Sequence, residues 1–275
     1  MISKLFRRNS LPKVRHGIPK DKRVFAIGDV HGRSDLLSCL LDKIYYQCRE
    51  RPLTDTHIIF LGDLIDRGPD SRGVLESILN MNPDLAKVHL IKGNHEEIFL
   101  TMLDGDTRSA RVFCNIGGRE TLASYGIDKN LFDEGGLDVL CQRAAASVPA
   151  EHKRLLDTGL DMLTIGDYLF THAGTRPGVP ISEQKPQDLR WIRSEFLDYE
   201  GTFEKVVVHG HSIAVEVEER PHRIGIDTGA YRSGILTALG LEGTNRWFIQ
   251  ASDADCQKSL HEAPFGRYRA TAAGA

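Results

Sequence analysis

The side chains best suited to chemistry in this chain follow short apolar runs. In residues 58–68, four apolar side chains lead into Gly62 and Asp63, and Asp66 and Arg67 come next. A short apolar run that ends at a glycine turn is typical of a buried strand. Open α/β sheets bind ligands at the carboxyl ends of their strands, so this segment is predicted to present its carboxylates in a site.

The same pattern occurs on either side of this segment and again later in the chain. The apolar run at 24–27 is followed by Gly28 and Asp29, and the run at 88–91 is followed, after one lysine, by Gly93, Asn94 and His95. Two later loops carry histidines. The candidate groups are Asp29, His31, Asp63, Asp66, Arg67, Asn94, His95, His172, His209 and His211. Hard oxygen ligands mixed with imidazoles suit Mn²⁺, Fe²⁺ or Zn²⁺ rather than a thiolate site. These residues are numerous enough to hold two ions.

Helical periodicity follows these loops. Apolar residues recur at helical spacing through residues 34–49, with Ser34 as the predicted N-cap, and again through residues 71–79, which Pro83 closes. A third helix is expected to start near Glu96. Alternating strands and helices predict an α/β protein with a largely parallel or mixed sheet that is flanked by helices.

The second half of the chain changes character. Charged helical segments with paired glycines occupy about 100–163, which predicts a helical insertion, and strands are expected at 163–171, 206–208, 224–227, 235–241 and 246–250. Residues 23–250 are thus predicted to form one domain. A basic tail at 1–22 precedes it, and residues 251–275 are interpreted as a mobile C-terminal tail without function.

Composition excludes several classes of protein. Hydrophobic residues make up 41% of the 275, charged residues 27%, and no apolar run reaches the roughly 18 residues of a membrane span. A net charge of -3 and a pI near 6.4 argue against a nucleic-acid coat protein. The five cysteines are odd in number and form no CxxC pair, so neither a disulfide framework nor a zinc–cysteine site is expected, and a cytoplasmic location fits.

Five ordered motifs resemble a known family. GDVHG at 28–32, GDLIDRG at 62–68, IKGNHE at 91–96, HAG at 172–174 and GH at 210–211 are similar to the signature of the phosphoprotein phosphatases, a branch of the calcineurin-like metallophosphoesterases. The resemblance covers about residues 23–241. It implies a four-layer αββα sandwich of mixed sheets, with the helical insertion over a dinuclear metal site.

The resemblance also implies which side chains hold the metals. Asp29, His31 and Asp63 would bind the first ion, and Asp63 would bridge to a second ion held by Asn94, His172 and His211. Mn²⁺ is the expected metal, with Fe or Zn as alternatives. Two such ions hold the phosphate and lower the pKa of a water, so that hydroxide attacks in line with the leaving group.

By the same resemblance, His95 is the general acid, oriented by Asp66, and Arg67 holds the phosphate. A second phosphate-binding arginine is expected, with Arg193 preferred and Arg190 as its rival. His209 is interpreted as supporting a ligand rather than binding metal. The segment 117–126 also resembles bacterial phosphatases, and we interpret it as a structural helix with a glycine break, except for a possible role of Arg119.

The implied activity is hydrolysis of phosphoserine or phosphothreonine in proteins, extending to phosphotyrosine and small phosphate esters. One alternative is a symmetrical diadenosine tetraphosphate hydrolase of the same superfamily. The segment Gly68-Pro69-Asp70-Ser71 resembles that group, whereas the Asp66-Arg67 pair and Glu96 resemble the protein phosphatases. Another alternative is a catalytically silent scaffold. Because every expected position is filled, this second alternative is disfavoured.

Overall fold

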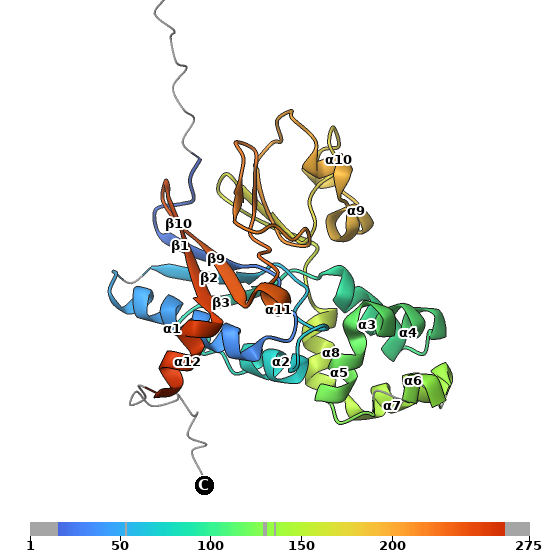
Figure 1. Cartoon of the computed structure of the whole chain (residues 1–275). Coiled ribbons are helices and arrows are strands. Elements are labelled where there is room, and N and C mark those ends of the chain that lie inside the picture. The colour runs from blue at the N-terminus through green and yellow to red at the C-terminus, as the bar shows by residue number, and fades with distance from the viewer. Residues whose placement is uncertain (1–15, 53, 129–130, 135, 262–275) are drawn as a thin grey trace, which may run out of the picture.

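The computed structural model describes residues 16–52, 54–128, 131–134 and 136–261, and its strands form two five-stranded sheets (Figure 1). The first sheet has the order β10 (Asn245–Ser252), β9 (Ile235–Glu242), β1 (Lys22–Ile27), β2 (Asp55–Phe60), β3 (Lys87–Leu90). The second has the order β4 (Met162–Ile165), β5 (Tyr168–Thr171), β6 (Val206–His209), β8 (Arg223–Gly225), β7 (Glu218–Glu219). The sheets are mixed, as predicted.

The parallel strands bring the predicted loops to one edge. β1 pairs in parallel with β2, with Ile27 opposite Phe60, and β2 pairs in parallel with β3, with Phe60 opposite Leu90. In the second sheet β5, β6 and β8 are also parallel. Since the chain leaves all of these strands in one direction within each sheet, the loops after them collect at a common edge.

Three apolar cores separate four layers. One core joins the first sheet to α1 (Ser34–Arg49) and α2 (Ser71–Leu79), a second lies between the sheets, and a third joins the second sheet to α9 (Pro186–Trp191) and α10 (Ser194–Leu197). Figure 1 shows α9 and α10 on the opposite side of the sandwich from α1 and α2. The predicted αββα sandwich is confirmed, as are the bounds of the helices at 34–49 and 71–79.

Two local predictions are wrong. Ser34 is the first residue inside α1 rather than its N-cap, which is Arg33, and the Ser34 hydroxyl instead donates to Asp70 at 2.7 Å. The predicted single strand at 163–171 is an antiparallel hairpin of β4 and β5 that turns at Gly166 and Asp167. Gly166 adopts a φ of +58°, which favours glycine, and the Gly166-Asp167 pair is a hairpin signal that the prediction overlooked.

The predicted insertion is helical and forms a lobe beside the sandwich (Figure 1). Its elements are α3 (Asn94–Leu103), α4 (Thr107–Phe113), the π-helical turn η1 (Cys114–Gly118), α5 (Arg119–Ser124), α6 (Leu131–Glu134), α7 (Leu137–Ser147) and α8 (Ala150–Asp157). α3 starts at Asn94, two residues before the expected start, so Asn94 and His95 both lie in its first turn. Two short helices, η2 (Ile181–Glu183) and α11 (Ala230–Ser233), lie in later loops.

The ends of the domain differ from the predicted boundaries. Ile18 is buried and its N–H donates to Gly243 at 2.8 Å, so ordered contacts begin within the predicted tail. At the other end α12 (Asp253–His261) packs against α1, and a disulfide joins Cys256 to Cys39. The mobile tail predicted from 251 is therefore wrong up to residue 261, and the cysteine spacing gave no sign of this bond. Residues 1–15 and 262–275 lie outside the described part.

Among the described helices, none is long and apolar enough to cross a membrane.

Candidate active site

Four of the six predicted ligands and the predicted acid His95 converge at the edge where the parallel strands end, whereas the predicted ligands Asp29 and Asn94 belong to neither of the two closest groups. Two groups of three side chains each place their ligand atoms within 4.8 Å of one another, and Asp63 belongs to both groups. The first group is His31, Asp63 and His95, and the second is Asp63, His172 and His211. All five side chains are buried.

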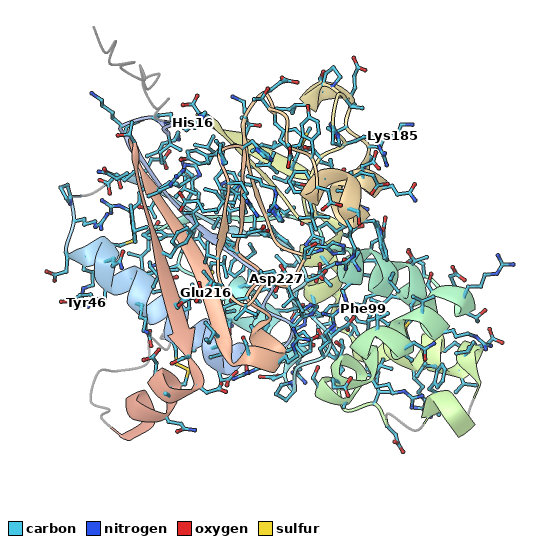
Figure 2. The ribbon with its side chains drawn as sticks, turned by 45° about the horizontal axis from the view of Figure 1, so that its top comes forward. His16, Tyr46, Phe99, Lys185, Glu216 and Asp227 are labelled. Carbon is cyan, nitrogen blue, oxygen red and sulfur yellow. A yellow bond between two sulfur atoms is a disulfide. The ribbon has the colours of Figure 1, made fainter. Side chains whose placement is uncertain are left out.

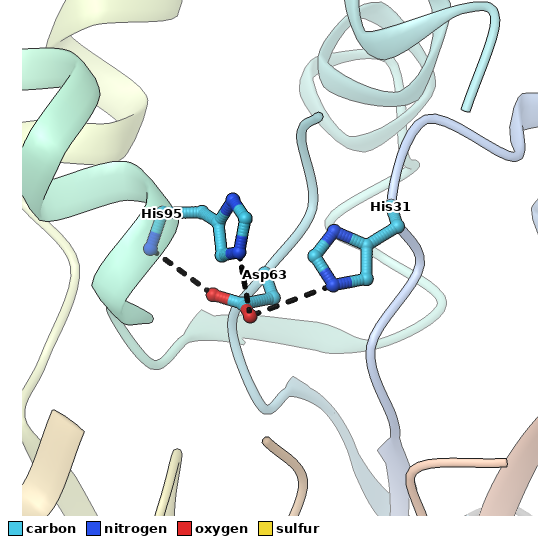
Figure 3. Close-up of side chains that lie close together, drawn as sticks. All are labelled: His31, Asp63 and His95. Atoms are coloured by element: carbon cyan, nitrogen blue, oxygen red, sulfur yellow. Dashed lines mark hydrogen bonds and ion pairs between the residues drawn. The ribbon is translucent and has the colours of Figure 1, made fainter. Parts of the chain in front are cut away.

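Asp63 faces the two groups with different oxygens. Its Oδ2 lies 3.5 Å from His31 Nε2, on the side shown in Figure 3, and its Oδ1 lies 3.3 Å from His172 Nε2. The Nε2 atom of His172 is also 3.0 Å from Asn94 Oδ1 and 3.1 Å from His211 Nδ1. A carboxylate with one oxygen in each cluster has the geometry that bridging two cations requires.

Backbone carbonyls orient two of the imidazoles. His31 Nδ1 lies 2.7 Å from the Ile65 carbonyl, and His172 Nδ1 lies 2.8 Å from the Leu61 carbonyl. Since only an N–H can donate there, each ring turns an unprotonated Nε2 toward Asp63. Burial lowers the pKa of His31 well below its usual value and that of His172 to about 4. Both rings are therefore neutral near pH 7, which is the form that binds metals.

Three buried carboxylates, Asp29, Asp63 and Asp227, crowd the same edge. Asp29 lies near Asp227, whose charge acts on it, and accepts from the His211 N–H at 3.0 Å. Burial, then repulsion by Asp227 and Asp63, raises the pKa of Asp29 well above its usual value, and burial also raises the pKa of Asp63. His211 Nε2 is buried and has no hydrogen-bond partner among the residues that the structure describes. This donor set fits divalent cations, which would offset the carboxylate charge and use the open nitrogen.

Several non-glycine residues at this edge adopt a left-handed backbone conformation. The non-glycine residues with positive φ among the described residues are His31, Asp63, Asp66, Arg67 and His211, and all five are predicted site residues. A left-handed conformation costs a residue with a Cβ roughly 1–2 kcal/mol. Such strain concentrates where the surrounding structure holds a functional geometry in place.

Glu96 supplies part of that support. Its Oε2 accepts from the N–H groups of Asp63 at 2.8 Å and Gly93 at 2.9 Å, and its Oε1 accepts from the Leu64 N–H at 2.8 Å. The fully buried carboxylate thus joins the loop after β2 to the start of α3. The sequence marks Glu96 as the expected start of a helix and as part of a family motif, but it does not predict this role.

The predicted acid pair is assembled. His95 Nδ1 lies 2.6 Å from Asp66 Oδ2, and His95 Nε2 lies 3.1 Å from an Arg67 nitrogen and 3.8 Å from Asp63 Oδ2. Burial raises the pKa of Asp66 well above its usual value and lowers that of His95. Because Asp66 holds Nδ1, the nitrogen that faces the metal-binding edge is Nε2.

The two rival arginines lie in different surroundings. Arg190 donates to Glu97 at 2.7 Å and also binds Asp161, so its charge is already compensated. Arg193 forms no ion pair with any residue that the structure describes, and its closest polar contact is the His211 carbonyl at 3.4 Å. Geometry therefore favours Arg193 as the arginine free to bind phosphate.

His209 lies outside both clusters. Its ring packs edge-on against Phe196, and its Nδ1 lies 3.0 Å from the Gly210 carbonyl. This placement agrees with the interpretation of His209 as a supporting residue.

Two further residues near the site, Asp227 and Tyr231, were not predicted from the sequence. Asp227, which Figure 2 labels near the middle of the molecule, follows β8, and its charge contributes to the raised pKa of Asp29. Only a partial signal was present, because Asp227 ends a predicted strand and a glycine follows two residues later rather than preceding it. Tyr231 has its ring 5.4 Å from that of His31, and the Arg67 guanidinium stacks on it at 4.9 Å. Its place on α11 could not be read from spacing.

The profile of the calcineurin-like phosphoesterases matches residues 22–222, which include every predicted ligand. The chain belongs to this family. Members of the calcineurin-like metallophosphoesterases use divalent metals, which agrees with the two ligand clusters. Individual relatives indicate which members of the family resemble this chain in sequence.

Curated relatives of this phosphoesterase are similar over most of their length. The asymmetrical bis(5'-nucleosyl)-tetraphosphatase PrpE of Halalkalibacterium halodurans is 25% identical over 235 residues, covering 78% of this chain and 87% of the relative. The protein of the same name from Bacillus subtilis is 27% identical, covering 78% and 88%.

Solved structures share the fold. A structure provisionally described as a diadenosine tetraphosphatase aligns with a TM-score of 0.58 at 21% identity, covering 88% of this chain and 97% of its own. The cold-active protein-tyrosine phosphatase of a Shewanella species aligns at 0.51 with 18% identity, covering 85% and 83%. At these identities the alignments establish the architecture of the phosphoesterase.

Proposed function

We propose that this phosphoesterase is a metal-dependent hydrolase of bis(5'-nucleosyl) tetraphosphates that cleaves them asymmetrically, releasing ATP and AMP from diadenosine tetraphosphate. The observation that carries the proposal is the name shared by curated relatives that align with 78% of this chain and 87–88% of their own length. The tetraphosphatase suggested by the sequence analysis was symmetrical. The relatives favour the same substrate class with a different point of cleavage.

The arrangement of side chains supports phosphate-ester hydrolysis. When bound, two divalent ions supply positive charge to the phosphate oxygens and lower the pKa of a water. Asp29, His31 and Asp63 are proposed to hold one ion, and Asp63, with Asn94, His172 and His211, the other.

The remaining site residues bind the substrate and move the proton. Arg67 and Arg193 are proposed to bind phosphate oxygens, because neither arginine has a carboxylate partner among the described residues. Arg67 can only donate to His95 Nε2, so this nitrogen becomes free to take up a proton when Arg67 turns to the phosphate. His95 is proposed to deliver that proton to the leaving oxygen while Asp66 holds its Nδ1. These groups act on any phosphate ester that reaches the edge of the sheets.

A second candidate is hydrolysis of phosphoserine or phosphothreonine. The observation in its favour is the complete His95–Asp66 pair at 2.6 Å. A serine alkoxide is a far more basic leaving group than a nucleotide phosphate, so it depends more on a positioned acid. The acid pair therefore suits the phosphomonoester reaction that the motifs indicated.

The test is to identify the products from two substrates. The full-length protein, loaded with Mn²⁺, is given diadenosine tetraphosphate and a phosphoserine peptide in parallel, and nucleotides and free phosphate are separated by anion-exchange chromatography. We expect preference for the dinucleotide with equal amounts of ATP and AMP. A matched sample treated with a chelator should be inactive on both substrates.

Each other outcome changes the proposal in a defined way. Release of ADP alone would reverse the assigned point of cleavage. Preference for the peptide, with free phosphate released, would replace the proposal by the second candidate. Equal activity with and without chelator would overturn the metal-dependent chemistry itself.

A further inference from the structure

The segment 117–121 of the helical insertion touches the acid pair, although the sequence analysis interpreted it as structural. Thr121, fully buried on α5, donates its hydroxyl to Asp66 Oδ1 at 2.6 Å. The same hydroxyl oxygen lies 2.9 Å from the Asp66 N–H and 2.8 Å from Ser71 Oγ. A hydroxyl has one donor and two acceptor positions, so these three contacts use all of them.

Both oxygens of Asp66 are consequently taken by different parts of the molecule. Oδ1 binds Thr121 in the insertion, and Oδ2 binds His95 at the start of α3. Ser71, at the start of α2, adds a contact to the Asp66 N–H at 3.0 Å. The plane of the carboxylate is thus set from the side opposite to the histidine.

The same segment holds the residue next to Asp66. The Arg67 N–H donates to the Gly117 carbonyl at 2.9 Å. Gly117 has a φ of +115°, and a Cβ built on it would lie 2.6 Å from Arg67 Cγ and 2.9 Å from its backbone nitrogen. Glycine is needed here for both conformation and close approach. Two successive residues with strained backbone, Asp66 and Arg67, are therefore both bound by the insertion.

We propose that Thr121 is a positioning residue for catalysis, acting through Asp66 to fix the ring of His95, and that the helical insertion is thereby coupled to proton delivery. The inference rests on the proposed function only in that His95 protonates the leaving group, and it holds for either candidate substrate. Removing the hydroxyl leaves Asp66 Oδ1 without its donor in a dry site, so the carboxylate turns and the imidazole loses its fixed direction. Misplacement of a catalytic group by about 1 Å costs on the order of a hundredfold in rate.

The test compares Thr121→Val, which keeps the shape but lacks the hydroxyl, with Thr121→Ser, which retains it. Thr56→Val is the matched control, because Thr56 is also a buried threonine but lies on β2 at the opposite end from the site. The substrates are phenyl phosphate and p-nitrophenyl phosphate with Mn²⁺. They are similar in shape, but phenol is the more basic leaving group and needs the acid more.

For Thr121→Val we expect kcat on phenyl phosphate to fall about tenfold or more, while kcat on p-nitrophenyl phosphate stays within about twofold. KM for both should be unchanged, because the hydroxyl touches no substrate. Thr121→Ser should restore the wild-type ratio between the two substrates, and Thr56→Val should match wild type throughout.

A second readout is independent of turnover and of metal. The Nδ1–H proton of His95, bonded to Asp66, gives a nitrogen-edited NMR signal in the chelator-treated protein, assigned by its loss in His95→Gln. We expect this signal to shift or exchange faster in Thr121→Val and to return in Thr121→Ser. An unchanged signal with an unchanged ratio of rates would overturn the inference, as would equal losses on both substrates that serine fails to restore.

The proposed function can fail separately. If diadenosine tetraphosphate is not cleaved while the aryl phosphates show the expected ratio, the substrate assignment is wrong and the role of Thr121 stands.

Discussion

Strand β2 has an aspartate–histidine group at each end, and the two groups differ in charge compensation. At its amino end Asp55 binds Lys22 at 2.5 Å and Lys87 at 2.8 Å, and it also contacts His57. Hydrogen bonds from those lysines hold the pKa of Asp55 well below its usual value. At the carboxyl end, Asp63 is buried beside histidines, and burial raises its pKa.

The difference separates a structural group from a reactive one. A carboxylate that already has two ammonium partners and solvent has no reason to bind another cation. A buried carboxylate without such partners is disfavoured in its charged form, and a cation that binds it offsets that cost. A neutral imidazole beside it offers a free nitrogen to the same cation. Residue type alone does not distinguish the two ends, because both present aspartate and histidine. Burial and the neighbouring cations do.

The largest expected effect is the difference between asparagine substitutions at the two ends of β2. Asp63→Asn keeps the shape but removes the charge between the two ligand clusters, so we expect turnover to fall on the order of a thousandfold or more. Bound Mn²⁺, measured by elemental analysis, should fall with it. Asp55→Asn should leave both quantities near wild type. Equal losses in the two variants, or full metal content in Asp63→Asn, would show that charge compensation is not the deciding factor.

The two arginines repeat the contrast on a smaller scale. Arg190 is held by Glu97 and Asp161, whereas Arg193 has no carboxylate partner among the described residues. Since a charged hydrogen bond contributes about 1.5–3 kcal/mol, Arg193→Gln should lower kcat/KM about 10- to 100-fold and weaken inhibition by inorganic phosphate.

Arg190→Gln is the matched variant. It should lower the melting temperature, because Glu97 and Asp161 lose their partner, but change kcat/KM by less than about threefold. The reverse pattern, with phosphate inhibition weakened only in Arg190→Gln, would exchange the two assignments.

The features that sequence could predict are those set by local pattern. Apolar runs ending at glycine marked the strands, the helical spacing marked 34–49 and 71–79, and parallel pairing then brought the loops together. The clusters around Asp63 follow from this, because β-strand register fixes where each loop emerges.

The features that sequence missed depend on contacts between distant segments. The Thr121–Asp66 bond joins residues 55 apart, and the Cys39–Cys256 disulfide joins residues 217 apart. Neither has a local signal. Ser34 was misassigned as an N-cap because Asp70, in another loop, takes its hydroxyl. Even Asp227, which ends a predicted strand, is recognised only once the second sheet brings its charge close to Asp29.

The smallest effect concerns pH at the amino end of β2. His89 stacks on His57, and burial, then His57 and Lys87, lowers the pKa of His89. The unfolded chain, with a histidine pKa of about 6.5, binds the proton more readily. The stability that neutral His89 contributes is therefore present above about pH 6.5 and lost as the pH falls through its lowered folded value. Because His89 is partly exposed, the effect is small.

His89→Gln removes this dependence. Between about pH 7.5 and about pH 5.5, the melting temperature of the variant should fall about 1 °C less than that of wild type, measured with saturating Mn²⁺ so that the site imidazoles stay bound. Lys87→Gln keeps the imidazole but removes one cause of its lowered pKa, so its fall should lie between the two. A steeper fall in His89→Gln would mean that His89 is protonated in the folded protein. The amino end of β2 would then hold charged histidine as well as charged aspartate, which would widen its contrast with the site.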